Sequence, residues 1–327
     1  MARAKPGPHP FPQFKRMRSR IPPASPRRGA RRLVSIVVGA FALAACHPGN
    51  EEAKRLRGAC EAADVAACNT LAIKLQKGEY VLRDDGHAAE LFDRACKGGV
   101  GAGCASLGLA YQKGTGVKRD SARAITLLEQ GCDRQAMDGC TRLGVLYRRG
   151  AGVTKDVVRA ASLFQKACDG KDMSGCAHLA ALHAAGEGVA QDFTKAALLS
   201  QQSCTAKVAL GCLGLGKLTG AGTGVPRNDS IAATLYEQSC EGGEDAGCLQ
   251  QGIVLETGVG VTQNFSRAGE LYREACENRL GEACARLAAL YDRGAGVRRS
   301  PERAKSFRKN ACDYGHVESC EKPKAAA

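Results

Sequence analysis

Tryptophan is absent from the 327-residue chain, and aromatic residues of all kinds make up only 5% of it. A chain with so few aromatic side chains has to build its core from alanine, leucine, valine and glycine. Its 40 glycines indicate many short connections. We therefore expect short elements joined by tight turns around a core of small aliphatic side chains.

Aspartate and glutamate are missing from residues 1–45, which carry ten lysines and arginines. The remainder of the chain has 37 basic and 33 acidic residues, so the formal net charge of +14 falls to 37 − 33 = +4 there. A nucleic-acid-binding domain carries its positive charge on one face of a folded surface. Because the excess charge belongs to the N-terminus instead, we expect no nucleic-acid partner.

An apolar run of 13 residues follows Arg32 and ends just before Cys46. It is shorter than the roughly 20 apolar residues that cross a bilayer, but a basic segment before such a run is typical of a signal peptide. The closing letters LAAC resemble a bacterial lipobox, which implies transfer of diacylglycerol to Cys46 and cleavage before it. The alternative is an ordinary signal peptide with a chance cysteine. We expect an exported protein, anchored by lipid on the periplasmic side of a bacterial outer or inner membrane.

Sixteen of the 17 cysteines form eight pairs, and the two members of each pair are eight positions apart. Each pair begins 36 residues after the preceding one, without an insertion or deletion. Such a fixed period is the signature of a repeat architecture. The odd cysteine is Cys46, so the cysteine count agrees with the expected lipid site. The pairs are Cys60 with Cys68, Cys96 with Cys104, Cys132 with Cys140, Cys168 with Cys176, Cys204 with Cys212, Cys240 with Cys248, Cys276 with Cys284 and Cys312 with Cys320.

Other residue columns recur with the same period. Three residues after the second cysteine, leucine occurs in six of the seven units, and Gln251 is the exception. A G-x-G-V turn follows, then Asp, Asn or Ser where a side chain caps a helix start, and alanine four residues later. These columns therefore predict that each unit forms a short helix, a glycine turn and a capped second helix. One such pair of helices cannot bury its own apolar face, so neighbouring pairs must stack into an α/α solenoid.

The segment Leu143–Ala160 reads LGVLYRRGAGVTKDVVRA. This pattern resembles the Sel-one-like repeat (SLR) family of tetratricopeptide-like solenoids, and the cysteine pairs resemble its cysteine-rich secreted bacterial branch. The resemblance implies an all-α fold, a right-handed superhelix of seven 36-residue helix-turn-helix repeats, with one disulfide per repeat and protein binding as the main use. In four repeats the tyrosine of the pattern is replaced, and we expect looser packing there: at Leu75, His183, Thr219 and Leu255.

The repeats also predict how the chain is divided. We expect seven hairpins between Cys68 and Cys312, a capping helix over 51–60, and a truncated eighth unit from His316 to Lys322. In the first repeat Tyr80 replaces the second glycine of the turn, so a different turn is expected there. The predicted parts are a signal peptide over 1–45, a lipidated tether and cap-helix start over 46–59, the solenoid over 60–322 and a disordered tail over 323–327.

Two cysteines eight residues apart cannot be bridged along one helix. Their Cα atoms would lie about 12 Å apart, whereas a disulfide needs roughly 4.4–6.8 Å. The chain must turn between them, and polar stretches such as 169–175 are suitable for a turn. Each bond would then join the second helix of one unit to the first helix of the next. Zinc clamps and redox pairs use closer cysteines, which makes both weaker alternatives, and we expect no metal or cofactor.

Catalytic motifs are scarce. The patterns G-x-S-x-G and H-E-x-x-H do not occur, so no catalytic residue is expected. Some cysteine-rich relatives are described as penicillin-binding or β-lactamase-like, which makes such a hydrolase the alternative function. The S-x-x-K motif of serine penicillin enzymes occurs at Ser306–Lys309 and Ser319–Lys322, but their S-D-N and K-T-G motifs are absent.

Three positions of each first helix are expected to lie outside the core, two, five and nine residues after its cysteine. In the resembling family these helices line the concave surface of the solenoid. The positions form an apolar stripe, with Leu109, Val145 and Ala289, edged by basic groups. We expect this stripe to bind an extended or acidic segment of a cell-envelope protein, with the chain acting as a monomeric adaptor or scaffold. The predicted partner-binding residues are Ser106, Lys113, Arg142, Arg149, His178, Arg286 and Arg293.

Overall fold

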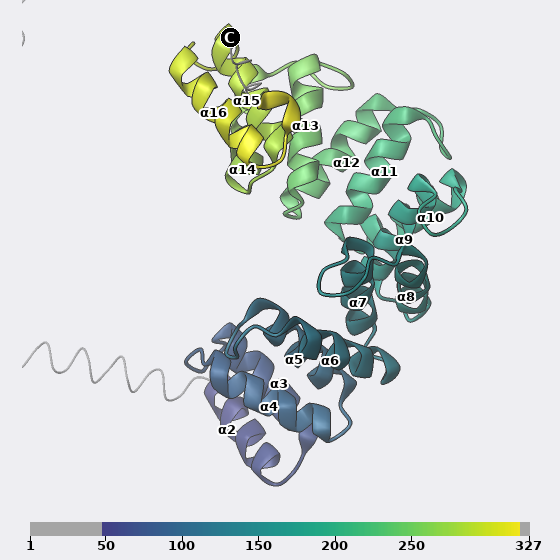
Figure 1. Ribbon diagram of the computed structural model, residues 1–327, viewed down its shortest axis with the longest axis vertical. Coiled ribbons are helices and arrows are strands. Elements are labelled where there is room, and N and C mark those ends of the chain that lie inside the picture. The colour runs from purple at the N-terminus through teal and green to yellow at the C-terminus, as the bar shows by residue number, and fades with distance from the viewer. Residues whose placement is uncertain (1–47, 321–327) are drawn as a thin grey trace, which may run out of the picture. The chain divides into compact units, whose positions relative to one another are not determined.

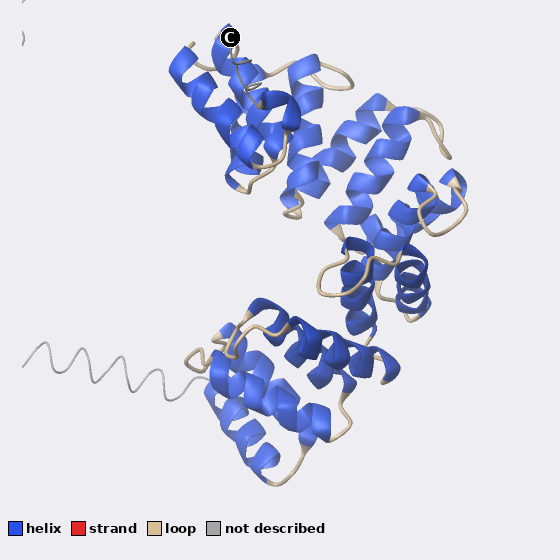
Figure 2. Cartoon of the chain, in the orientation of Figure 1, coloured by secondary structure: helices blue, strands red, loops and turns tan. Residues whose placement is uncertain are grey.

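The computed structural model describes residues 48–320. The expected signal peptide, Cys46 and the tail over 323–327 lie outside this range. Within it the chain forms 15 α-helices and one 3-10 helix, and no residue of that range is in a strand (Figure 1, Figure 2). None of these helices is long and apolar enough to cross a membrane.

Helices that follow one another in the chain pack side by side (Figure 1). Helix α2, Pro48–Glu61, precedes seven hairpins, which lie in a compact unit that starts at Glu52. The 3-10 helix η1, Val317–Ser319, follows the last hairpin. The first helices are α3 (Val65–Lys77), α5 (Gly101–Lys113), α7 (Met137–Arg149), α9 (Met173–Ala185), α11 (Ala209–Ala221), α13 (Asp245–Thr257) and α15 (Gly281–Arg293). The second helices are α4 (Asp85–Lys97), α6 (Ser121–Asp133), α8 (Val157–Asp169), α10 (Phe193–Thr205), α12 (Asp229–Glu241), α14 (Phe265–Glu277) and α16 (Pro301–Asp313).

Side-chain caps and glycines fix the ends of these helices. The carboxylate of Asp156 accepts a hydrogen bond from the Arg159 N–H at 2.8 Å, which satisfies one of the free donors at the start of α8. The first helix before it ends at Gly150, whose φ of 69° is left-handed. The same cap recurs at every second helix, on Asp84, Asp120, Asp156, Asp192, Asn228, Asn264 and Ser300.

The second glycine of the turn touches the preceding repeat. An ideal Cβ placed on Gly224 would lie 2.2 Å from the carbonyl oxygen of Phe193, at the start of the preceding second helix. In the first repeat Tyr80 occupies this position with the same left-handed φ, 61°, so the expectation of a different turn there is wrong. Only α2, and no full hairpin, precedes that turn, and Tyr80 is exposed. A side chain is therefore tolerated at the one turn that packs against no earlier hairpin.

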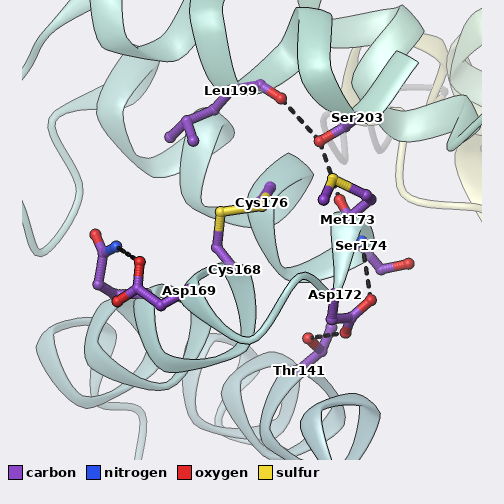
Figure 3. Close-up of a disulfide and its surroundings, with 10 residues drawn as sticks. Thr141, Cys168, Asp169, Asp172, Met173, Ser174, Cys176, Leu199 and Ser203 are labelled. Carbon is purple, nitrogen blue, oxygen red and sulfur yellow. Dashed lines mark hydrogen bonds between the residues drawn. A yellow bond between two sulfur atoms is a disulfide. The ribbon is translucent and has the colours of Figure 1, made fainter. Parts of the chain in front are cut away.

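Disulfides close the junctions between hairpins. In Figure 3, Cys168 near the end of α8 meets Cys176 in α9, across a turn in which Lys171 has a left-handed φ of 67°. The predicted link from the second helix of one unit to the first helix of the next is therefore present in the described part of the chain. All eight cysteine pairs are bonded, with Cα–Cα distances of 4.4–4.8 Å: Cys60 to Cys68, Cys96 to Cys104, Cys132 to Cys140, Cys168 to Cys176, Cys204 to Cys212, Cys240 to Cys248, Cys276 to Cys284 and Cys312 to Cys320.

Two of these bonds are covered by a polar side chain from the following hairpin, located in its second helix or directly after it. The Arg134 guanidinium, just after α6, donates to the carbonyl oxygen of Cys96 at 2.6 Å and lies 3.2 Å from the sulfur of Cys104. In α12, the amide oxygen of Gln238 lies 3.9 Å from the sulfur of Cys212. Both Cys104 and Cys212 are buried. The bonds of Cys104 and Cys212 are therefore covered by side chains of the following repeat.

The core follows the predicted columns. The alanine four residues after each cap is 2% exposed or less in all seven hairpins. Most buried apolar residues belong to three large clusters. Leu75 lies in one of them and Leu255 packs against another, so the expectation of looser packing is wrong for Leu75 and has no support at Leu255. His183 and Thr219 are as buried as Tyr147 at the same repeat position, so it has no support there either.

Successive first helices contact one another, as α5 does α7, α7 does α9 and α9 does α11. Together with the contacts within each hairpin, this is the packing of a solenoid. The predicted all-α, α/α solenoid of seven helix-turn-helix repeats is thus confirmed. We call the surface that these helices present the first-helix face.

Candidate functional site

The predicted partner-binding residues all lie on first helices. Ser106 and Lys113 belong to α5, Arg142 and Arg149 to α7, and His178 to α9. Arg286 and Arg293, on α15, are at the other end of the array. The structure brings together only part of this set.

A groove of about 640 Å³ crosses α5, α7 and α9. Two apolar side chains, Leu109 and Val145, line it together with the predicted Lys113, Arg142 and His178. Ser106 and Arg149 are not among its lining residues. The groove thus joins an apolar surface to basic side chains, as the stripe predicts. Its lining is Leu109, Gln112, Lys113, Arg119, Asp138, Thr141, Arg142, Val145, Asp172, Ser174 and His178.

The basic side chains of the groove make fewer ion pairs and hydrogen bonds within the chain than its carboxylates do. Lys113 and Arg119 are exposed and form no ion pair within residues 48–320, and Arg142 lies 3.6 Å from Asp138 on a half-exposed helix surface. Such surface pairs contribute little, about 0–1 kcal/mol. The carboxylate of Asp172 is already occupied, since it accepts the Thr141 hydroxyl at 2.6 Å and the Ser174 N–H at 3.1 Å (Figure 3). The groove is therefore suited to an anionic group.

His178 is the one ionisable group in the groove with a strongly shifted pKa. Its ring stacks on Phe164 with 4.9 Å between centroids, and its buried Nδ1 has no hydrogen-bond partner in the described part of the chain. Burial, reinforced by the charges of Arg148 and Arg149, lowers the pKa of His178 to about 4, and Asp172 opposes this only in part. The imidazole is therefore neutral near pH 7.

Acid should destabilise the fold through His178. Its folded pKa of about 4 lies below the unfolded value near 6.5, so the unfolded chain binds the proton first as pH falls. The contribution of neutral His178 to the free energy of unfolding is fully present above pH 6.5 and is lost as pH falls from 6.5 to 4. From pH 7.5 to 5 we expect a loss of about 2 kcal/mol in the free energy of unfolding. Urea titrations should show this part of the pH dependence disappearing in His178→Phe, which keeps a stacking ring; identical pH profiles for both proteins would contradict the assignment.

Arg286 and Arg293 are engaged within the chain. Both pair with Glu256 of α13, Arg286 at 3.7 Å, and Arg286 also pairs with Glu282. The hydroxyl of Tyr272 donates to the same Glu256 at 2.7 Å, which fixes the carboxylate in place. These two arginines are thus largely neutralised, and the groove over α5, α7 and α9 is the stronger candidate.

Six groove residues were missed by the sequence prediction because they lie outside the three positions considered: Gln112, Arg119, Asp138, Thr141, Asp172 and Ser174. Arg119 is in the turn after α5, Thr141 directly follows Cys140, and Asp172 caps α9. The signal that could have found Asp172 is its place just before a first helix, where a capping side chain is expected.

A group of possible metal ligands is formed by Cys240, Cys248 and Glu274. The two cysteines are bonded to each other, so they offer no thiolate to a metal ion. The arrangement provides one carboxylate, which is too few ligands for a zinc site.

The serines of the two S-x-x-K motifs lie near the C-terminus. Ser306 and Lys309 are exposed on α16, and Ser319 lies in η1, where its Oγ is 2.8 Å from Nδ1 of His316. Lys322 is outside the described residues. A serine beside a histidine three residues away is also a common local turn contact, so this pair does not define a catalytic centre.

The seven repeats match known proteins. The crystal structure of a protective antigen present in uropathogenic Escherichia coli strains, which displays an SLR fold, matches 82% of this chain with 25% identity and a TM-score of 0.59, and this chain spans 57% of its length. That of a Sel1 repeat protein from Oxalobacter formigenes matches 80% of this chain and 99% of its own length with 19% identity and a TM-score of 0.63, a likeness of fold. Cysteine rich protein B of Helicobacter pylori is 27% identical over 40% of this chain and 93% of its own, with a TM-score of 0.33. A search of curated proteins finds no match.

A family model described as Sel1 repeat matches the chain seven times in succession. The matched segments are residues 65–100, 101–135, 138–172, 174–207, 209–244, 248–279 and 281–315. They cover every hairpin of the described structure, and the chain therefore belongs to the Sel1 repeat family.

Proposed function

We propose that this protein is a lipid-anchored adaptor of a bacterial cell envelope, which binds protein partners through its first-helix face. Sel1 repeats are protein-interaction modules. Eight disulfides favour an oxidising compartment such as the periplasm, and the LAAC sequence at Cys46 supports lipid attachment. A mass spectrum of the N-terminal peptide tests the anchor, since Cys46 should carry a diacylglyceryl group; an unmodified Cys46 in mature protein would contradict it.

The observation that carries the binding proposal is the groove over α5, α7 and α9. It offers the apolar side chains Leu109 and Val145 beside Lys113 and Arg119, which form no ion pair among the described residues. An extended segment with apolar and acidic side chains would complement both parts of this surface. Electrostatic complementarity of this kind adds to association rate and partner choice more than to affinity.

Charge reversal on α7 tests the binding surface. After crosslinking in whole envelopes has identified a partner, its affinity should fall at least tenfold for the double variant Arg142→Glu with Arg149→Glu, because repulsion replaces attraction. The loss should shrink as salt is raised.

A matched control is available on the second helices. Lys195 and Lys305 are exposed on α10 and α16 and form no ion pair within 48–320. The double variant Lys195→Glu with Lys305→Glu makes the same charge change away from the first-helix face, and we expect less than a twofold effect. Equal losses for the two double variants would show that net charge, and not the first-helix face, governs binding.

No arrangement of residues in the described part of the chain supports the hydrolase alternative. We therefore assign no reaction to the S-x-x-K serines. Turnover of nitrocefin by purified protein that is lost in Ser306→Ala or Ser319→Ala would overturn this conclusion.

A further inference from the structure

In most repeats the residue four positions after the buried alanine of the second helix fills the space beside the first helix of the same repeat. The rings of Phe164, Tyr236 and Tyr272 pack so closely that an ideal Cβ on Gly144, Gly216 or Gly252 would lie within 2.7 Å of them. With Phe92 of the same column, these rings are four of the six buried aromatic side chains in residues 48–320. The column is Phe92, Leu128, Phe164, Ser200, Tyr236, Tyr272 and Arg308.

Ser200 breaks this column in the fourth hairpin. The repeats on either side place Phe164 and Tyr236 there, whereas the hydroxymethyl group of Ser200 leaves part of a ring's space unfilled. Ala180 stands beside it where those repeats have Gly144 and Gly216. The structure has a pocket of about 310 Å³ there, between α9, α10 and α11. Its lining is almost entirely apolar: Ala177, Ala180, Ala181, Ala184, Ala185, Leu210, Leu213, Gly214 and Leu218, with Ser200 and Lys217.

The Ser200 side chain lines the pocket, and its hydroxyl has no protein partner among the described residues. The residue is 2% exposed. Gly214 keeps the way to it open, since an ideal Cβ at that position would lie 2.8 Å from the Ser200 Oγ. A ligand hydroxyl that pairs with Ser200 would therefore make a hydrogen bond that only water can make in the free protein.

The rim of the pocket carries one cation. Lys217 is exposed and forms no ion pair in the described part of the chain. The first helices of this region otherwise present small side chains, among them Ala181 and Ala185. The pocket therefore combines a positive charge at its rim, from Lys217, with an apolar lining and the hydroxyl of Ser200.

We propose that this pocket binds a tyrosine side chain of the partner segment, with an acidic group beside that tyrosine against Lys217. The proposal deepens the proposed function and rests on it. An aromatic ring suits the space because the chain itself places a ring at the same position in the hairpins on both sides. Tyrosine is favoured over phenylalanine because its hydroxyl can pair with Ser200, and buried tyrosine hydroxyls usually have such a partner.

Small probes test the pocket without knowledge of the partner. N-acetyl-L-tyrosine carries both the ring and a carboxylate, and for a ligand of its size we expect a dissociation constant of about 1 mM. N-acetyl-L-phenylalanine should bind at least threefold more weakly, and N-acetyl-L-alanine should not bind detectably. Ligand-observed NMR on the full exported chain measures all three. Equal binding of the tyrosine and alanine probes would overturn the proposal.

Variants distinguish this pocket from the groove over α5, α7 and α9. Ser200→Phe should fill the pocket and abolish binding of N-acetyl-L-tyrosine, and Ser200→Ala, which removes only the hydroxyl, should erase the threefold preference over phenylalanine. Lys217→Glu, an exposed change that does not disturb the core, should weaken the tyrosine probe at least threefold. Lys113→Glu, in the other groove, should leave it unchanged. Unaltered binding in both Ser200→Ala and Lys217→Glu would exclude the pocket.

The same variants separate failure of this inference from failure of the proposed function. A partner whose affinity falls with Arg142→Glu and Arg149→Glu, but not with Ser200→Phe, would contradict the tyrosine pocket alone. A partner insensitive to all of these changes would contradict both.

Discussion

Replacing Cys276 and Cys284 together with alanine is expected to lower the free energy of unfolding by about 3 kcal/mol. The bond closes a loop of about nine residues, and the loop-entropy model gives 2–3 kcal/mol for such a loop. Both cysteines are buried in the C-terminal core cluster, so their loss also removes packing contacts. Urea titration of the oxidised protein, followed by circular dichroism, measures the change.

The last disulfide is a control with the same loop length. Cys312 and Cys320 are half-buried, and the bond joins α16 only to η1, which buries no residue. In a solenoid each repeat is stabilised by its neighbours, so a terminal junction matters less than an internal one. Because the terminal turn can open locally while the rest of the solenoid stays folded, we expect the double alanine variant there to lower the global free energy of unfolding by about 1 kcal/mol or less. A smaller effect at Cys276 and Cys284 than at this end would contradict the role of the internal bonds.

Gly224→Ala is expected to destabilise the protein by about 3–4 kcal/mol. Gly224 has a φ of 72°, a conformation that costs an alanine about 1–2 kcal/mol. The added Cβ would also lie 2.2 Å from the Phe193 carbonyl oxygen, so the turn would have to move away from the preceding hairpin. The shift of the urea midpoint measures the total.

A second glycine separates conformational strain from the clash. Gly243, in the following junction, has a φ of 84°, and an ideal Cβ there has no atom within 4 Å. Gly243→Ala should therefore cost only about 1 kcal/mol. If Gly224→Ala were no more destabilising than Gly243→Ala, the close approach between successive hairpins would not contribute to stability.

The helices and junctions could be predicted from sequence because each is encoded locally. A cap such as Asp156, a glycine such as Gly150 and the spacing of two cysteines act over a few residues, and the period of 36 repeats them without a slip. The registers of seven hairpins therefore follow from columns of single residues. The turn at Tyr80 was predicted wrongly, since Tyr80 adopts the left-handed φ of the glycines, and its place before the first full hairpin explains why a side chain fits there.

The interaction surface was less accessible to sequence reasoning because its charges depend on contacts between repeats. Glu256 pairs with Arg286 and Arg293, 30 and 37 residues later in the chain, and nothing local marks that pairing. Ser200 is different, because the column from Phe92 to Tyr272 was readable in the sequence. The sequence could not show that the helices around Ser200 keep their spacing, so that a pocket remains where other repeats have a ring.

The measurement that tests the account most directly is a thiol count on the mature protein purified from cell envelopes. The protein is denatured and alkylated without reduction, then analysed by mass spectrometry. We predict no label on the sixteen paired cysteines, with linkages between partners eight residues apart, as in Cys168–Cys176. Labelling of several paired cysteines, or linkages between different junctions, would contradict the disulfide-closed solenoid and the exported location proposed from it.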